Sequence, residues 1–330
     1  MMLIINNVEN SENRRGAIDM KKKTFVVKHR YVKEGMYMKT PLFAHIELTK
    51  QCPLLCSQCY CNFDAEKTGE IKWEECKKII DEIGDWGVEQ ILLTGGEPLL
   101  YPYIYECLEF IKLKGMISVI SSSGYGMSDN ICDRLFSCGL DKIYISLNGS
   151  KAIVHNQSRS HYEESIKAIE VIKSKNYFCG INWVARNDNI DDFKELYKLA
   201  ADKGINEIVI LANKKDSSGK VRNELTNDQL EQLVNNVKVL QKESISILID
   251  PCYKSLLQKL YNKSDFTNIC SAGRTFFDVL TTGEVLPCRH LENIYQPEKY
   301  DDLKIWWVES ENLKNQRNEQ ESDKKCQDII

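Results

Sequence analysis

Three cysteines on one short segment determine the chemistry that this chain can do. They are Cys52, Cys56 and Cys59, in the run QCPLLCSQCY, and their spacing is C-x3-C-x2-C. A strand-like run from Phe43 to Leu48 leads into them. Thiolates are soft ligands that favour iron–sulfur clusters. Three thiolates on a four-iron cluster leave one iron without a protein ligand, so this loop is predicted to bind and activate a small molecule.

A second segment supports this interpretation. Gly95-Gly96-Glu97-Pro98 follows the apolar run Ile91–Leu93 and is separated from the cysteines by a predicted helix. Together the two segments resemble the cluster and GGEP motifs of the radical S-adenosylmethionine (SAM) superfamily, and Tyr60 is the aromatic residue expected beside the third cysteine. The resemblance implies a [4Fe-4S] cluster on the three cysteines, with GGEP at the methionine end of SAM. A GGEP segment alone is also typical of a plain turn between a strand and a helix.

Length, composition and charge set limits on function. The 330 residues allow one large domain and a small one, and 42% hydrophobic with 28% charged residues is typical of a soluble globular protein. The net charge of −4 favours neither nucleic acid nor membrane as a partner. No apolar run approaches the ~18 residues of a membrane span. Thirteen cysteines without a secretory segment predict a reducing, cytoplasmic location, where clustered cysteines bind metal or act in catalysis.

From residue 43 onward, predicted strands and helices alternate. The strands are predicted at Ala44–Leu48, Gln90–Leu93, Ser118–Ser121, Lys142–Ser146, Ile181–Ala185 and Glu207–Leu211. The helices are predicted at Trp73–Trp86, Tyr103–Lys114, Asp129–Cys138, Tyr162–Lys175, Ile190–Lys203 and Asp228–Gln241. Six such pairs favour an α/β fold with a parallel sheet and outer helices, which right-handed crossovers curl into a partial (β/α)6 barrel.

The predicted barrel places the chemically interesting segments together. Parallel sheets of this kind bind ligands at the C-terminal ends of their strands. The cysteine loop, GGEP, Ser122–Gly124 and Asn148–Gly149 all follow predicted strands, so we expect them on one rim. We expect three parts: an N-terminal extension over 1–42 with a short strand at Thr24–Val27, the barrel over 43–250, and a small β-hairpin/helix iron–sulfur domain over 251–330.

The resemblance also assigns further SAM-binding residues. It implies that Ser122, Ser146 and Asn148 face the cofactor, and that Glu97 accepts hydrogen bonds from an ammonium group. Arg159 would pair with the SAM carboxylate through its planar guanidinium. The alternative for Arg159 is a solvated residue at the start of a helix.

A second group of cysteines lies near the C-terminus. Cys270 and Cys288 have the pattern C-x12-G-x4-C, with Gly283 at a hairpin turn between Phe277–Leu280 and Val285–Pro287. This pattern resembles the SPASM domain and its shorter relative, the twitch domain, which add auxiliary iron–sulfur clusters to radical SAM barrels. The resemblance implies a second [4Fe-4S] cluster on Cys270, Cys288 and Cys326, with Cys252 as a possible further ligand. A zinc hairpin or two buried thiols are the alternatives.

The other cysteines fall on predicted helices or strands and are assigned to packing, except Cys61. Cys61 is too close to Cys59 to complete the cluster and is either a hydrogen-atom donor or an inert loop residue. The family's shared reaction is reductive cleavage of SAM to a 5′-deoxyadenosyl radical that removes a hydrogen from substrate, which implies a flavodoxin or ferredoxin as electron donor.

The sequence indicates the class of enzyme more strongly than it indicates the substrate. The cysteine run looks most like that of enzymes that crosslink or epimerise ribosomally made peptides, so we expect a peptide substrate with a leader. An edge strand such as Thr24–Val27 would capture the leader by strand addition. A dehydrogenase or cyclase acting on a small molecule, and a metal-binding scaffold without catalysis, are the alternatives.

Overall fold

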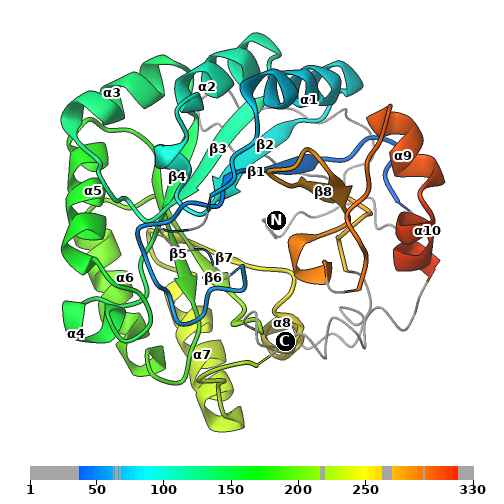
Figure 1. Cartoon of the computed structure of the whole chain (residues 1–330). Helices are drawn as coiled ribbons and strands as arrows, with labels where there is room; N and C mark the ends of the chain where they lie inside the picture. The colour runs from blue at the N-terminus through cyan, green and yellow to red at the C-terminus, as the bar shows by residue number, and fades with distance from the viewer. Residues whose placement is uncertain are drawn as a thin grey trace, which may run out of the picture.

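The computed structural model describes residues 37–318, except 62, 64–65, 67, 216–219, 262–269 and 293. Within these residues, nine strands form one sheet in the order β7-β6-β5-β4-β3-β2-β1-β8-β9 (Figure 1). The strands are β1 (Phe43–Thr49), β2 (Gln90–Gly95), β3 (Ile117–Ser122), β4 (Lys142–Ser146), β5 (Cys179–Val184), β6 (Glu207–Leu211), β7 (Ser246–Ile249), β8 (Phe276–Val279) and β9 (Val285–Leu286). The predicted strand Thr24–Val27 lies outside the described residues.

Helices surround the outer face of the curled sheet (Figure 1). They are α1 (Trp73–Trp86), α2 (Ile104–Leu113), α3 (Asp129–Ser137), α4 (Ala152–His155), α5 (Tyr162–Ser174), α6 (Phe193–Asp202), α7 (Asn227–Leu240), α8 (Lys254–Tyr261), α9 (Leu303–Glu309) and α10 (Glu311–Asn318). The apolar stripe of each long helix is buried against the sheet, as Ile79, Ile80 and Ile83 of α1 illustrate. Helix α7 begins with the capping box of Thr226 and Gln229. None of the described helices is long and apolar enough to cross a membrane.

The predicted α/β fold with a parallel barrel-like sheet is confirmed, with one strand more than predicted. All six predicted strands and six predicted helices are present within a few residues, and neighbouring strands from β1 to β7 pair in parallel. The additional strand, β7, contains only Ser246–Ile249 and follows α7 closely. Four residues carry too little periodicity to identify a strand from sequence alone.

The C-terminal hairpin joins this sheet and does not stand apart from it. Strand β8 pairs in parallel with β1, with Phe43 opposite Phe276 and Ile46 opposite Val279, and antiparallel β9 follows after the turn at Gly283. Gly283 has a φ of 80°, which favours glycine. Strand β1 is therefore hydrogen-bonded on both sides, and the sheet runs without a break from the predicted barrel into the predicted C-terminal domain.

Alternate residues of the strands face the lumen. In β1 the apolar residues Ala44, Ile46 and Leu48 are fully buried in the outer core, whereas His45 and Glu47 line the interior cavity. The deeper part of the lumen is closed by a smaller cluster around Val119, Tyr144, Val209 and Leu248. The inner face of the sheet is therefore polar near the mouth and apolar below it.

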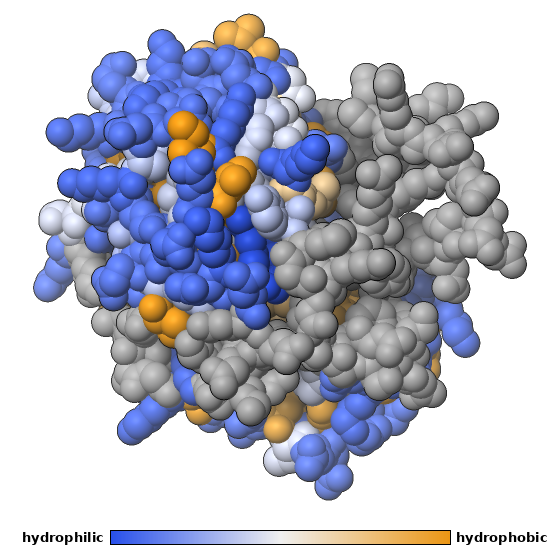
Figure 2. All heavy atoms as spheres, turned by 90° about the vertical axis from the view of Figure 1, so that its right-hand side faces the viewer, coloured by the Kyte–Doolittle hydropathy of each residue, from blue (hydrophilic) through white to orange (hydrophobic). Residues whose placement is uncertain are grey.

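Helices α9 and α10 pack beside β8 through a group of aromatic side chains (Figure 1). Trp307 is fully buried, lies 6.0 Å from both Trp86 and Phe277 between ring centroids, and donates from Nε1 to the Met38 carbonyl at 2.8 Å. On the face shown in Figure 2, apolar side chains form small separate spots among hydrophilic residues. Trp307 thus attaches the C-terminal helices to the edge of the barrel.

We predict that Trp307→Ala lowers the free energy of unfolding by about 3–5 kcal/mol, because it removes a fully buried aromatic side chain. Ile305→Ala, on the same helix at a position 58% exposed, is expected to change it by less than about 0.5 kcal/mol. Urea unfolding of the two variants measures the difference. Equal midpoints would show that α9 does not contribute to the barrel's stability.

Candidate functional site

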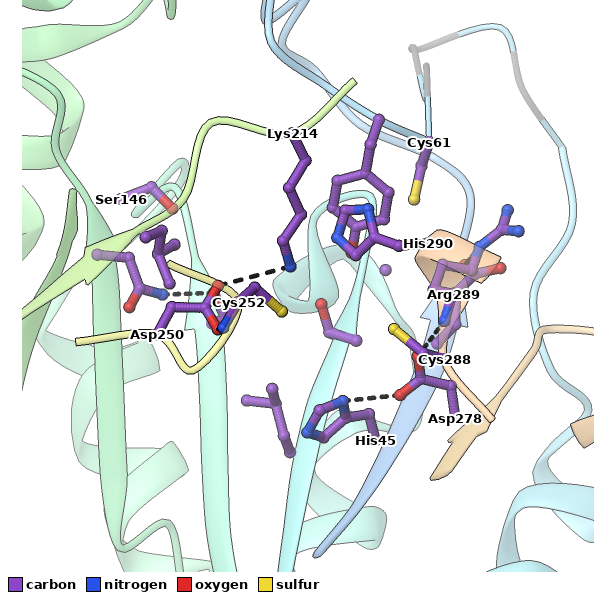
Figure 3. A pocket seen from close by; sticks show the side chains of 18 of the residues that line it. His45, Cys61, Ser146, Lys214, Asp250, Cys252, Asp278, Cys288, Arg289 and His290 are labelled. Carbon is purple, nitrogen blue, oxygen red and sulfur yellow. Dashed lines mark hydrogen bonds and ion pairs between the residues drawn. The ribbon is translucent and has the colours of Figure 1, made fainter. Parts of the chain in front are cut away.

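A cavity of about 370 Å³ lies in the lumen, at the C-terminal ends of the strands (Figure 3). Most residues predicted from the sequence line it: Cys52, Cys56, Cys59, Cys61, Gly95, Gly96, Ser122, Ser146, Arg159, Cys252, Cys270 and Cys288. Glu97, Pro98 and Asn148 are not among its lining residues. Cys326 lies outside the described residues. The rim expected from the strand order therefore exists, and both groups of cysteines face the same space.

The cysteine loop starts where β1 ends and is held by backbone hydrogen bonds. The Cys59 amide donates to the Cys56 carbonyl at 3.1 Å, and the Ser57 amide donates to the Ser158 carbonyl at 2.9 Å. Burial raises the pKa of Cys52 to about 11, and burial, opposed by nearby Arg159, also raises the pKa of Cys56. These groups are therefore thiols until a metal displaces their protons.

The donor set fits a four-iron cluster better than a single ion. Within the described part of the chain, no three His, Cys, Asp or Glu side chains gather closely enough to chelate one metal ion. A cubane cluster does not need such a gathering, because each cysteine binds a different iron. Soft sulfur donors at the cavity mouth are the ligands that such clusters prefer.

The glycine pair after β2 is required by the cysteine loop itself. A Cβ atom on Gly95 would lie 2.4 Å from the Thr49 carbonyl oxygen, and one on Gly96 would lie 2.2 Å from that of Gln51. The Gly96 amide donates to the Thr49 carbonyl at 2.7 Å, and the Glu97 amide donates to Gln51 at 2.8 Å. Only glycine allows this approach, so GGEP fixes the start of the cysteine loop at the cavity wall.

Glu97 is buried and saturated with protein hydrogen bonds. Its carboxylate accepts from the Ser122 hydroxyl at 2.7 Å, from the amide and hydroxyl of Ser123, and from the Leu99 amide at 3.2 Å. Burial raises its pKa, while the hydrogen bonds from Ser123 and Ser122 lower it. Glu97 therefore holds the turn after β3 in place, rather than presenting a free oxygen to the ammonium group expected from sequence.

The residues after β4 divide into one group that faces the cavity and one that supports it. Ser146 and Arg159 line the cavity, and the buried Nε of Arg159 has no hydrogen-bond partner among the described residues. The side chain of Asn148 instead donates to the Ser158 hydroxyl at 2.8 Å and accepts from the Val184 amide at 3.3 Å, so it holds these segments together behind the cavity wall. Buried His155 accepts from the Asn148 amide at 3.2 Å, and burial lowers its pKa to about 4.

The second group of thiols lines the same cavity. Cys252 follows β7, Cys270 precedes β8 and Cys288 follows β9. Burial and then Asp250 raise the pKa of Cys252 to about 12, and Cys270 contributes in the same direction. Burial also raises the pKa of Cys288, to which Asp278, Cys252 and Cys270 contribute. The three thiols thus line one cavity, although they come from three separate segments.

Cys61 also lines the cavity. Burial raises the pKa of its thiol, while the neighbouring Arg289 guanidinium lowers it. The ring of Tyr60 beside it contacts that of His290 at a tilt of 37°, with ring centroids 3.8 Å apart. The segment after Cys59 is therefore in contact with the segment after Cys288, which brings the two cysteine groups into one structural unit.

Sequence reasoning missed a polar cluster on β1 and β8, formed by His45, Glu47, Asp278 and Arg289. His45 Nδ1 lies 2.7 Å from Asp278 Oδ1 (Figure 3). Arg289 Nε lies 3.0 Å from Glu47 Oε2. Burial raises the pKa of Glu47, and Arg289 opposes the shift. The signal was present in the alternation of FAHIEL, where His45 and Glu47 occupy the face opposite Ala44, Ile46 and Leu48.

Comparison with known proteins agrees with this geometry. Residues 46–200 match the model of the Radical SAM superfamily. An AdoMet-dependent heme synthase of Methanosarcina barkeri is 23% identical over 299 residues, covering 85% of this chain and 86% of that protein. A PqqA peptide cyclase of Granulibacter bethesdensis is 24% identical over 266 residues, covering 78% of this chain and 70% of that protein.

Solved structures share the fold. Streptococcus suis SuiB bound to the precursor peptide SuiA superposes with a TM-score of 0.73 at 17% identity, covering 86% of this chain and 68% of that one. At this identity the likeness shows the fold alone. The family implies a [4Fe-4S] cluster and SAM as cofactors. With the three-cysteine loop, the glycine turn and the family match in one barrel, the chain contains a radical SAM domain and is a radical SAM enzyme.

Proposed function

We propose that Cys52, Cys56 and Cys59 hold the [4Fe-4S] cluster and leave one iron open for SAM. When bound and reduced, this pair supplies the 5′-deoxyadenosyl radical that removes a hydrogen from substrate. What supports the assignment is that the three sulfurs face the same cavity as the glycine turn. The chain's own contribution is to position the reactants and exclude water from the lumen.

Four cavity-lining residues are proposed to bind SAM directly. Gly95 and Gly96 present backbone, Ser122 and Ser146 present hydroxyls, and all four border the cysteine loop's side of the cavity. Arg159 is proposed to pair with the SAM carboxylate, because its buried Nε has no hydrogen-bond partner among the described residues. Glu97, Pro98 and Asn148 do not line the cavity, and we propose that they support SAM binding indirectly, by holding these segments in place.

We propose an auxiliary [4Fe-4S] cluster on Cys270 and Cys288, with Cys252 and Cys326 as further ligands. Cys252, Cys270 and Cys288 all line the cavity, which supports a ligand set drawn from these three segments. Arg317 of α10 donates to the Gly273 carbonyl at 2.6 Å, so the C-terminal helix is attached beside the Cys270 segment.

For the substrate, we propose a ribosomally made peptide that is crosslinked or epimerised. The single observation that carries this is the size of the cavity, about 370 Å³, which is at the low end for a site holding one ligand. It must also accept a cluster and SAM, so only the reacting part of a substrate fits. A peptide can insert one side chain and leave its remainder outside.

A small-molecule substrate is the second candidate. The observation that favours it is the likeness to the AdoMet-dependent heme synthase over 85% of the chain. Incubating the reduced enzyme with SAM and a short peptide encoded beside its gene separates the two. A change in peptide mass or stereochemistry supports the peptide; SAM cleavage with an unchanged peptide favours the small molecule.

We further propose a flavodoxin or ferredoxin as electron donor in a cytoplasmic setting. Leu55, within the cysteine loop, is 80% exposed, so this loop reaches the surface where a reductase can approach. Cys61 stays a candidate hydrogen-atom donor, because it faces the cavity beside both cysteine groups.

Cys56→Ala is predicted to abolish the first cluster and SAM cleavage, because it removes one of three iron ligands. Cys138→Ala is the matched control, since Cys138 lies at the end of α3 and contacts Glu109, away from the cavity. Anaerobic iron and sulfide analysis and the yield of 5′-deoxyadenosine measure both effects. Full SAM cleavage by Cys56→Ala would refute the cluster assignment.

Cys288→Ala is predicted to remove only the auxiliary cluster. The iron and sulfide content of the protein should fall by the amount that this cluster contributes. SAM cleavage should continue, and substrate turnover should stop. The same Cys138→Ala variant controls for the loss of a thiol. Unchanged iron content together with unchanged product formation would contradict the auxiliary cluster.

A further inference from the structure

His45 presents one edge of its imidazole ring to the cavity. Its Nδ1 lies 2.7 Å from Asp278 Oδ1, and the other ring nitrogen points away from Asp278, across the lumen (Figure 3). The side chain is 15% exposed and lines the cavity. Within the described part of the chain, Nε2 has no hydrogen-bond partner. The ring is therefore held at one nitrogen and open at the other.

Contacts on several sides fix the orientation of this ring. Asp278 lies directly opposite His45 in the register of β8 and β1, and its Oδ2 accepts from the Arg289 backbone amide. The ring of Phe276 stacks on His45, with ring centroids 4.9 Å apart. On the other side, Leu92 of β2 lies opposite His45. Turning the ring would break the contacts with Asp278 and Phe276, so Nε2 has a defined position in the lumen.

The carboxylate also selects the state of the ring. A carboxylate only accepts hydrogen bonds, so the nitrogen that faces Asp278 has to be the donor. In the neutral ring Nε2 then carries the lone pair, and this lone pair faces the cavity. An aspartate orients the histidine base of catalytic triads in the same way, and imidazole is the commonest general base in enzymes.

Other acid–base groups of the cavity are already engaged with cations. Glu47 pairs with Arg289, and Asp250 Oδ2 lies 3.5 Å from Lys214 Nζ. Proton uptake by either carboxylate would weaken its ion pair. A proton taken up by His45 would instead strengthen the contact with Asp278, because both partners would then be charged. The geometry therefore favours His45 as the group that accepts a proton from a bound substrate.

A base of this kind suits one branch of the proposed peptide chemistry. Removal of a hydrogen atom by the 5′-deoxyadenosyl radical leaves an unpaired electron on a peptide carbon. When that carbon bonds to a second peptide atom that carries hydrogen, closing the bond releases one proton and one electron. Epimerisation instead replaces the lost hydrogen atom, for which Cys61 is the candidate donor, and releases neither.

We propose that His45 is the general base of a crosslinking reaction and that Asp278 is its positioning residue. Nε2 accepts the proton that the second peptide atom loses, and the electron passes to the auxiliary [4Fe-4S] cluster proposed above. One C–H bond and one further bond to hydrogen break, and one bond forms between the two heavy atoms. SAM, reduced by one electron from the donor protein, yields methionine and 5′-deoxyadenosine. This inference rests on the proposed peptide-modifying function and selects crosslinking over epimerisation.

The first test is the product of the unaltered holoenzyme. The reduced enzyme is given SAM and the short peptide encoded beside its gene, and peptide mass and stereochemistry are measured with 5′-deoxyadenosine. We expect a peptide lighter by two hydrogen atoms for each crosslink. An epimerised peptide of unchanged mass would overturn the base and leave the proposed function standing. Absence of 5′-deoxyadenosine, or its formation with an unmodified peptide, would overturn both.

His45→Asn separates a base from a structural partner of Asp278. The shorter amide can still donate to Asp278 but has no atom at the position of Nε2. Crosslinking should slow by at least about 10²-fold, whereas 5′-deoxyadenosine should still form. Titration of the unreduced holoenzyme with the peptide should give an unchanged affinity. Crosslinking at the rate of the unaltered enzyme would overturn the proposal.

His161→Asn is the matched control for the loss of an imidazole. The His161 ring contacts the Ser160 hydroxyl and does not line the cavity, and asparagine tolerates the φ of 69° at this position. This variant should crosslink the peptide at the rate of the unaltered enzyme. An equal loss of crosslinking in His161→Asn and His45→Asn would contradict the assignment.

Chemical rescue decides the role of His45 even if His45→Asn does not fold. His45→Ala leaves space for a ring between Phe276 and Asp278, so free imidazole should restore part of its crosslinking and should not raise that of the unaltered enzyme. Asp278→Asn should lower kcat for crosslinking at an unchanged KM for the peptide, without rescue, because its amide can donate to Nδ1 and so place the proton on Nε2. A His45→Ala enzyme that binds the peptide but is not restored by imidazole would overturn the proposal.

Discussion

The structure depends on one strand being hydrogen-bonded on both sides. Strand β1 pairs with β2 and with β8, so its direction and height in the sheet are fixed by two parallel ladders. Its C-terminal end starts the cysteine loop, and its inward face carries His45 and Glu47. The hydrogen bonds from Gly96 and Glu97 to Thr49 and Gln51 then fix the start of the loop. Hydrogen bonds of the chain itself therefore set the mutual positions of the loop, the glycine turn and the polar cluster.

The same pairing explains how two groups of cysteines far apart in sequence share one cavity. A hairpin in a separate domain would need its own core and interface to face the barrel mouth. Here β8 is part of the barrel sheet, and Cys270 and Cys288 flank the hairpin that it starts. The contact between the rings of Tyr60 and His290 joins the segments after Cys59 and Cys288 directly.

Much of this arrangement could be predicted from sequence, for physical reasons that differ between elements. The long amphipathic helices, such as α1, and the buried strands before the cysteine loop and GGEP have strong periodicity, and their order defines the rim. Strand β7 was missed because four residues carry little pattern. The hydrogen bonds of Glu97 to Ser122 and Ser123 were not predicted, because a motif does not reveal which side chains its carboxylate contacts. The pairing of Asp278 with His45 depends on register between β8 and β1, which no local pattern encodes.

The central claim is that the cubane on Cys52, Cys56 and Cys59 has one iron open to SAM. Electron paramagnetic resonance of the anaerobically prepared, reduced protein, recorded with and without SAM, tests it most directly. The account predicts a reduced [4Fe-4S] signal that changes shape when SAM is added and that disappears when the three cysteines are replaced together. A spectrum without a cubane signal, or one that SAM leaves unaltered, would contradict it.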